Sequence, residues 1–249
     1  MDVAIVTVGD ELLVGETTNE NAAWLAGEVT NRGGRVREIL TIGDDSDAIA
    51  DAVRERATQY DRVIVTGGLG GTPDDVTMTG VAQALDRDVV VDPDLRATAQ
   101  AASEAFVEAH PDLAEKYDLG LDADRVAQTV AGGQMLENPE GLAPGCRVEN
   151  VVVLPGVPSE LKATFDAVAA EFAGDMVVET RFTDAPEGVL GRHLAELEAA
   201  FAVHGGSYPG ERASQNRVRI SGEQAAVEAA LAWLGDRITL ETVGQPGED

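Results

Sequence analysis

Short apolar runs alternate with amphipathic stretches along the first third of the chain. Residues 3–8 and 63–66 are apolar runs typical of buried parallel strands, and residues 36–42 are a third candidate strand. The other stretches show helical periodicity and span residues 22–32, 46–57 and 76–85. Strands that alternate with helices in this way predict an α/β fold with a parallel sheet, whose ligands bind beyond the carboxyl ends of the strands.

The middle of the chain has a different pattern. Residues 92–131 are alanine-rich and helical in pattern, with Pro93 at a helix start and Pro111 as a break. Two short strands follow, at residues 134–136 and 151–154. A further helix is predicted after the second strand; Ser159 can cap it, and it runs to about Phe172.

A new alternation begins near Gly174. It predicts strands at residues 176–182 and 218–220 and helices at residues 189–201 and 224–234. The predicted organisation is therefore an α/β domain of residues 1–173, followed by a small α+β module of residues 174–249.

The charge balance is extreme for a chain of 249 residues. It has 45 acidic against 18 basic residues, a net charge of −27, and only Lys116 and Lys162 are lysines. A field this negative repels nucleic acid and anionic membrane surfaces, so neither is expected as a partner. The spread of carboxylates along the chain and the near-absence of lysine indicate adaptation to a salt-rich cytoplasm, in which self-repulsion is screened.

Cysteine and histidine are too few for several classes of site. Cys146 is the only cysteine, which excludes an intrachain disulfide and a cysteine-based metal site. His110, His193 and His204 lack ligand spacing, which argues against zinc. The chain starts directly with a strand-like run and has no apolar stretch of the ~20 residues that a membrane span needs, so we expect a soluble cytoplasmic protein.

Residues 61–79 carry the strongest functional signal. Here the chain runs from a buried strand through a glycine-rich loop and an acidic pair into a helix. Glycine lets backbone N–H groups approach an anion, and carboxylates beside a phosphate indicate a cation between them. The stretch predicts a site for a phosphorylated ligand with Mg²⁺ or a similar metal, and its candidate residues are Gly67, Gly68, Gly70, Gly71, Thr72, Asp74, Asp75 and Thr77. The alternative is a tight turn in which the carboxylates only favour the helix dipole.

Carboxylates also follow the other two predicted strands. Asp10 and Glu11 come after the first strand, and Asp44 and Asp45 come after the second. Because the carboxyl ends of parallel strands meet at one edge, the three acidic loops are expected to converge. We expect Glu11 or Asp10 to complete a metal shell or to act as general base. The candidate metal ligands are Asp75, Asp44 and Asp74. The alternatives are a surface turn at residues 10–11 and a plain helix N-cap at residues 44–45.

Two later loops are shaped by proline and glycine. Residues 138–145 hold two prolines and two glycines, and residues 155–158 end the strand at 151–154. The candidate contacts to the rest of the ligand are Gly141, Pro144, Gly145 and Ser159. A strand–turn–helix joint without ligand contact is an equally good interpretation of the second loop.

Four motifs together resemble the CinA-like branch of the molybdopterin-binding fold of the MoaB and MogA type. They span residues 9–15 with Asn19 and Asn21, residues 66–77, residues 138–145 and residues 154–162. The resemblance implies a three-layer fold around a parallel or mixed sheet, followed by a small KH-like α+β module. It also implies a homo-oligomer.

The same resemblance implies a metal-dependent nucleotide pyrophosphatase that hydrolyses ADP-ribose or a related dinucleotide with Mg²⁺ or Co²⁺. The chain departs from this pattern in two ways. The deamidase domain that many bacterial members carry is absent from these 249 residues, so deamidation is not expected. Asp74 also stands where cofactor-synthesis members of the MogA type carry an arginine, which weakens the case for molybdopterin chemistry.

Three functions of different classes stay open at this point. The first is the pyrophosphatase. The second is a molybdopterin-binding protein of cofactor biosynthesis, and the third is a regulatory module that binds a nucleotide without hydrolysing it. The acidic loops favour an enzyme, because binding alone would use basic residues for phosphate.

Overall fold

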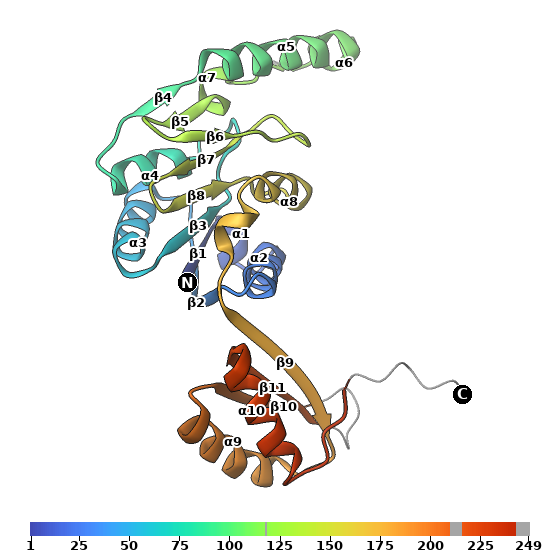
Figure 1. The fold of residues 1–249 in the computed structure, drawn as a ribbon. Coiled ribbons are helices and arrows are strands. Elements are labelled where there is room, and N and C mark those ends of the chain that lie inside the picture. Colours follow the sequence, from blue (N-terminus) through green and yellow to red (C-terminus); the bar gives the residue numbers. More distant parts are fainter. Residues whose placement is uncertain (118, 210–215, 243–249) are drawn as a thin grey trace. The chain divides into compact units, whose positions relative to one another are not determined.

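The structure, a computed structural model, describes residues 1–117, 119–209 and 216–242 (Figure 1). Its contacts divide the chain into two compact units: residues 1–29 with 36–172, and residues 30–35 with those from 173 onward. Segment 30–35 joins the second unit because the Gly174 N–H donates to the Arg32 carbonyl (2.9 Å) and the Met176 N–H to the Gly33 carbonyl (3.1 Å). The sequence pattern did not indicate that segment 30–35 belongs to the second unit.

A six-stranded sheet in the order β2-β1-β3-β8-β7-β6 forms the centre of the first unit. Its strands are β1 (Asp2–Val8), β2 (Arg35–Ile42), β3 (Arg62–Thr66), β6 (Gln134–Leu136), β7 (Gly145–Val148) and β8 (Val151–Leu154). Strands β1, β3 and β8 are parallel, with Val6 opposite Val65 and Val65 opposite Val153. Strands β6 and β7 run antiparallel to their neighbours, so the sheet is mixed.

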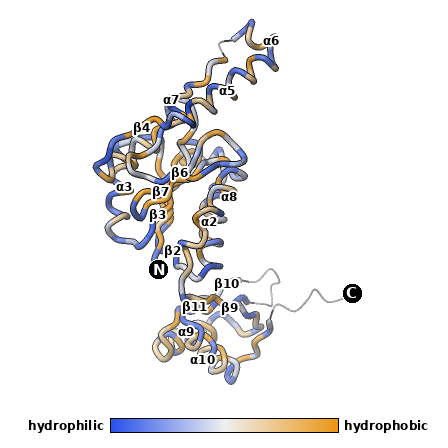
Figure 2. The backbone as a smooth tube through the Cα atoms, turned by 45° about the horizontal axis from the view of Figure 1, so that its top comes forward, coloured by the Kyte–Doolittle hydropathy of each residue, from blue (hydrophilic) through white to orange (hydrophobic). Residues whose placement is uncertain are grey.

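Helices cover both faces of this sheet. On one face α3 (Ser46–Gln59) and α4 (Thr77–Ala84) pack Ile49 and Val81 against alternate valines of the central strands. On the other face α2 (Glu20–Asn31), α8 (Pro158–Asp166) and the 3-10 turn Ala169–Phe172 pack Leu25 and Phe165 against Ile5 and Val152. Because both faces are covered, the central strands need apolar residues on both sides, and Figure 2 shows hydrophobic colours along β3. The expected three-layer α/β fold is confirmed.

The helical prediction for residues 92–131 is only partly right. Helices α5 (Pro93–Ala109), α6 (Pro111–Ala114) and α7 (Ala123–Val126) are present, and the Asp92 side chain caps α5. The end of the range is instead β5 (Gln128–Val130), which pairs with β4 (Val89–Val91). The sequence cannot reveal this pairing, because three residues carry no distinct periodicity and Val130 finds its partner, Val89, far away along the chain.

Three further local predictions were wrong. Residues expected in a loop after the first strand form the short helix α1 (Asp10–Leu13). Gly145, expected in a shaped loop, is buried in β7. Ser159 does not cap α8, which begins at Pro158 after Val157 with no side-chain cap. Proline at the first helical position makes a side-chain cap less necessary, since that position lacks an N–H to satisfy.

The second unit contains a three-stranded antiparallel sheet in the order β10-β11-β9. Its elements are β9 (Met176–Thr183), α9 (Glu187–Phe201), β10 (His204–Pro209), β11 (Asn216–Glu223) and α10 (Gln224–Gly235). Leu190 and Leu197 of α9 and Leu234 of α10 pack on Val218 and Ile220 of β11. The unit is α+β as expected, although β10, with two glycines, was missed. Its likeness to a KH domain stays a prediction.

Among the described residues no helix has both the length and the apolar character to cross a bilayer.

The aromatic cluster under the sheet makes the core testable. Phe165 is fully buried, edge-on to Trp24 (5.5 Å between centroids) and stacked on Phe172 (5.3 Å). We expect Phe165→Ala to lower the free energy of unfolding by about 3–5 kcal/mol, measured by urea denaturation, because it leaves a cavity among packed rings. Phe106→Ala, at a half-exposed ring of α5, should cost well under ~1 kcal/mol. Equal losses would contradict this account of the core.

Candidate functional site

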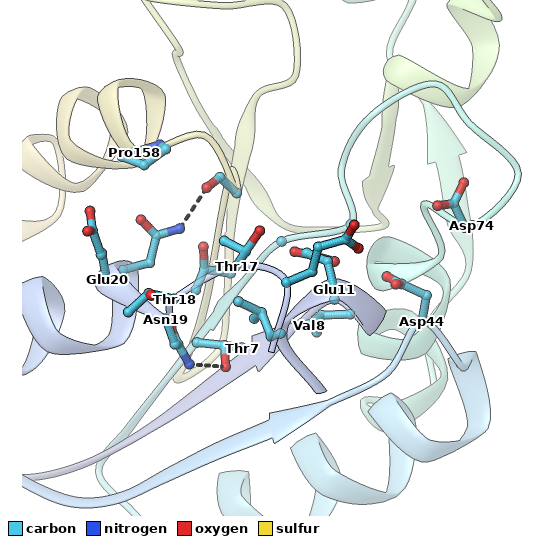
Figure 3. A pocket seen from close by; sticks show the side chains of 18 of the residues that line it. Thr7, Val8, Glu11, Thr17, Thr18, Asn19, Glu20, Asp44, Asp74 and Pro158 are labelled. Atoms are coloured by element: carbon cyan, nitrogen blue, oxygen red, sulfur yellow. Dashed lines mark hydrogen bonds between the residues drawn. The ribbon is translucent and has the colours of Figure 1, made fainter. Parts of the chain in front are cut away.

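A cavity of about 600 Å³ opens at the carboxyl ends of the central strands. Figure 3 shows Glu11, Asp44 and Asp74 near one end of it, and Asn19 and Glu20 at the other. Its lining is mostly threonines, glycines, amides and carboxylates, with three apolar residues: Thr7, Val8, Gly9, Glu11, Leu12, Glu16, Thr17, Thr18, Asn19, Glu20, Asn21, Asp44, Thr66, Gly67, Gly68, Asp74, Asp75, Gly156 and Pro158. The expected convergence of three acidic loops is therefore present in the structure, although Asp10 is not part of this lining.

The glycine loop passes directly over the ends of two strands. Gly67 has φ +103°, and a Cβ there would lie 2.1 Å from the carbonyl oxygen of Val8. Gly68 has φ +62°, and a Cβ at Gly156 would come within 3.2 Å of the Gly67 Cα. Only glycine fits this conformation and this distance without strain. Gly67 and Gly68 line the 600 Å³ cavity, whereas Gly70 and Gly71 do not.

Asp10 and Asp44 bind each other's backbone. The Asp10 N–H donates to Asp44 Oδ2 (2.9 Å), and the Asp44 N–H donates to Asp10 Oδ1 (3.3 Å). A Cβ at Gly43 would lie 2.4 Å from Asp10 Oδ1, so a larger residue there would displace this carboxylate. This exchange of hydrogen bonds joins the ends of β1 and β2. It gives the carboxylate of Asp10 a structural role. Of the first acidic pair, Glu11 is the one that lines the cavity.

The surroundings of Asp44 raise its pKa. Partial burial, and then the negative charges of Asp10, Glu11 and Asp74, raise the pKa of Asp44 above its ordinary 3.8, although the hydrogen bond from the Asp10 N–H opposes this. The neighbouring Asp45 has a different role, because its side chain accepts from the N–H groups of residues 47 and 48 and caps α3. The plain N-cap alternative is thus right for Asp45.

Asp74 and Asp75 lie in the turn before α4. Asp75 Oδ2 accepts hydrogen bonds from the Thr72 N–H (2.8 Å) and from the Thr72 Oγ1 (2.6 Å), so this carboxylate closes the turn. Asp74 is exposed, and its pKa is lowered by the Thr72 side chain, by its own backbone N–H and by Arg125. Thr77 Oγ1 is buried under Gly68 and has no hydrogen-bond partner among the described residues.

The carboxylates do not form a ready-made metal cage. In the described part of the chain, no three or more acidic, histidine or cysteine side chains are close enough together to hold a metal ion. Mg²⁺ seldom requires such a cage, since it often binds one or two carboxylates together with substrate phosphates and water. The acidic end of the cavity fits an ion that arrives with a phosphorylated ligand.

A second cavity, of about 530 Å³, lies on the other side of the glycine loop. Gly68, Asp75 and Gly156 line both cavities. The rest of its wall is mostly apolar: Leu69, Gly70, Gly71, Leu121, Val126, Gly141, Leu142, Ala143, Pro155, Val157 and Glu160. Among the residues predicted to contact the rest of the ligand, Gly141 reaches this cavity, whereas Pro144, Gly145 and Ser159 line neither of the two.

The sequence interpretation missed the role of two asparagines. Asn19 caps α2 through the Ala22 N–H (3.1 Å), and its amide also donates to Thr7 Oγ1 (2.8 Å) inside the cavity lining. Asn21 donates to the Gly156 carbonyl (2.6 Å), which joins α2 to the loop after β8. In the sequence, Asn19 and Asn21 were identified as part of a family motif, with no role assigned to either side chain. One side chain is enough to cap a helix, so the second asparagine was the sign in the sequence that these residues have a further role.

Comparison with known proteins places this fold and site in a wider group. The family described as "Probable molybdopterin binding domain" matches residues 4–174. A protein of Pyrococcus horikoshii is 40% identical over 213 residues, covering 79% of this chain and 82% of its own length. A CinA-like protein of Thermotoga neapolitana is 34% identical over 201 residues, 78% of this chain, which spans 47% of that relative.

The similarity extends to a solved structure, in both sequence and fold. It is the protein CinA from Thermoplasma acidophilum, described as of unknown function. It is 33% identical with a TM-score of 0.59, and the match covers 70% of this chain and all of that one.

The electrostatics of Asp44 give a pH-dependent prediction. Its raised pKa means that the folded state favours the protonated group, so this stabilisation is present at low pH and is lost as pH rises from 3.8 through the higher folded-state pKa. Asp44→Asn removes the charge and keeps an oxygen for the Asp10 N–H. We expect its Tm to exceed wild type at neutral pH and low salt, and the gain to shrink in molar KCl and below pH 3.8. A lower Tm at neutral pH would refute this, and Asp112→Asn on α6 is the control.

The loop geometry predicts that Gly67 cannot be replaced. Gly67→Ala combines a positive φ with a clash against backbone, so we expect it to cost at least ~2 kcal/mol in the free energy of unfolding. Gly27→Ala is the matched control, because Gly27 is exposed in α2 and a Cβ there would meet no atom within 4 Å. It should stabilise by up to ~1 kcal/mol. Urea unfolding measures both, and a Gly67→Ala protein as stable as wild type would overturn the assigned constraint.

Proposed function

The chain belongs to the family of probable molybdopterin-binding domains, in its CinA-like branch, and from this premise we propose that it is a nucleotide pyrophosphatase. The substrate class is ADP-ribose or a related dinucleotide, and the reaction is hydrolysis of its diphosphate bridge with a divalent cation, Mg²⁺ or Co²⁺. The family itself suggests a pterin- or nucleotide-like small molecule as ligand.

One observation carries the proposal. Gly67 and Gly68, both at positive φ, form a wall of the same cavity into which Glu11, Asp44 and Asp74 project. A glycine backbone can approach phosphate oxygens closely, and the start of α4 follows within the same loop. Carboxylates beside that wall suit the activation of water and the binding of a cation more than simple retention of an anion.

Each residue then has a defined task. The backbone around Gly67 and Gly68 holds the diphosphate, and the buried hydroxyl of Thr77 supports the loop from below. Glu11, free of the exchange that engages Asp10, takes the proton of the attacking water. The new bond forms between that water oxygen and phosphorus, and the bond from phosphorus to the bridging oxygen breaks, so the products are two monophosphates.

The acidic side chains would also hold the cation. Asp44, Asp74 and Asp75 are the candidates beside the glycine loop. When bound, a divalent ion neutralises the charge of the phosphates. Because the described residues form no three-carboxylate cage, the ion would have to bind together with the substrate phosphates.

A second candidate function follows from the family description. A molybdopterin-binding protein would use the same glycine loop for the pterin's phosphate and would show no turnover of ADP-ribose. A regulatory module would bind nucleotide, again without product. In both of these functions the glycine loop would bind phosphate, and Glu11 would not act as a base.

The deciding experiment is a turnover assay that follows AMP release from ADP-ribose in molar KCl with Mg²⁺, Co²⁺ or EDTA. We expect metal-dependent release and at least ~100-fold less in Glu11→Gln, since general-base removal costs about 10²–10⁴. Asp75→Asn keeps an oxygen for the Thr72 N–H and should also lose activity, while Asp112→Asn on α6 should not.

The outcomes separate the candidate functions. AMP release that continues in EDTA would contradict the requirement for a cation. Full activity in Glu11→Gln would contradict the role of Glu11 as general base. Folded protein that releases no AMP but binds a pterin would support the molybdopterin function, and protein that binds only nucleotide would support the regulatory one.

A further inference from the structure

The second cavity differs in character from the first. Its wall is built from aliphatic residues, and two of them, Leu142 and Val157, are 41% and 52% exposed. Exposed aliphatic side chains are conspicuous around a concave site in a chain of net charge −27. Apart from Asp75 at the shared edge, Glu160 is the only ionisable residue of this lining.

Glu160 is held in place by the loop that covers it. Its Oε2 accepts a hydrogen bond from Asn138 Nδ2 (2.7 Å), and the same amide donates to the Ala143 carbonyl (2.8 Å). A Cβ at Gly141 would lie 2.3 Å from the Glu160 carboxyl carbon, so the loop backbone packs directly on the carboxylate. The Gly141 backbone lies against both carboxylate oxygens, but within the described residues no group donates to Oε1 of Glu160, so that oxygen can still accept a hydrogen bond.

We propose that this cavity binds the heterocyclic base of the nucleotide, and that Glu160 accepts a hydrogen bond from an exocyclic amino group of that base. The inference rests on the proposed function, because the diphosphate must lie at the shared edge near Gly68 for the base to reach the second cavity. The remaining half of the molecule then occupies the polar first cavity.

The chemistry of the wall selects this class of ligand. Leu142 and Val157 offer apolar surface to the faces of a flat ring, and burying a ring there removes apolar area from water. An ionised carboxylate only accepts hydrogen bonds, so it pairs with an amino group and repels a ring carbonyl. A carboxylate that faces position 6 of a purine should therefore bind adenine, which has an amino group there, better than hypoxanthine, which has a carbonyl oxygen there.

Equilibrium binding of AMP and IMP by calorimetry tests this without any turnover. We expect wild-type protein to bind AMP at least about tenfold more tightly than IMP, the effect of a hydrogen bond to a charged group. Glu160→Gln presents an amide that donates to a carbonyl and still pairs with Asn138, so the preference should fall to about threefold or less, or reverse. Glu140→Gln, on the same loop but outside the cavity lining, should keep the wild-type preference.

A third variant distinguishes the contribution of the apolar wall to binding from that of the carboxylate. Leu142→Ala should weaken AMP and IMP by the same factor, about fivefold, because both bases lose the same apolar contact.

The results bear separately on the two proposals. Equal affinities for AMP and IMP in wild type, or a preference unchanged by Glu160→Gln, would overturn the base pocket even if ADP-ribose is hydrolysed. An AMP preference that Glu160→Gln abolishes supports the base pocket even if ADP-ribose is not hydrolysed, and the hydrolytic function would then be the part that fails.

Discussion

The close approach of Gly67 to the carbonyl oxygen of Val8 is the constraint on which the rest of the site depends. A Cβ there would lie 2.1 Å from that oxygen, so two strand ends meet with no side chain between them. The loop that follows can then cross the edge of the sheet and separate two cavities. Asn21 secures the third strand end by its hydrogen bond to the Gly156 carbonyl.

Electrostatic repulsion is the cost of this arrangement. Asp10, Glu11, Asp44 and Asp74 gather where the strands end, and partial burial together with the charges of its three neighbours raises the pKa of Asp44. The backbone exchange between Asp10 and Asp44 holds two of these carboxylates in place despite the repulsion. A site that concentrates negative charge around an anion-binding loop is best balanced when cation and phosphate are both present.

Long apolar runs made much of the fold predictable, because β1, β3 and β8 are buried on both faces and are apolar along most of their length. Among the short elements, β6 was predicted, whereas β5, with three residues, and β10, with two glycines, were missed because neither has a clear apolar pattern. The site was predictable as a set of loops. Individual roles were not, since adjacent residues such as Asp44 and Asp45 differ only in the partners that tertiary structure supplies.

The two cavities share an edge at Gly68, Asp75 and Gly156. If the bond that breaks lies at this edge, each product is left in a compartment of its own, one polar and one apolar. Neither fragment then has to pass the other to leave, so the order of release is set by the affinity of each compartment for its fragment. Accumulation of one product would occupy half of the site and would exclude new substrate as effectively as both together.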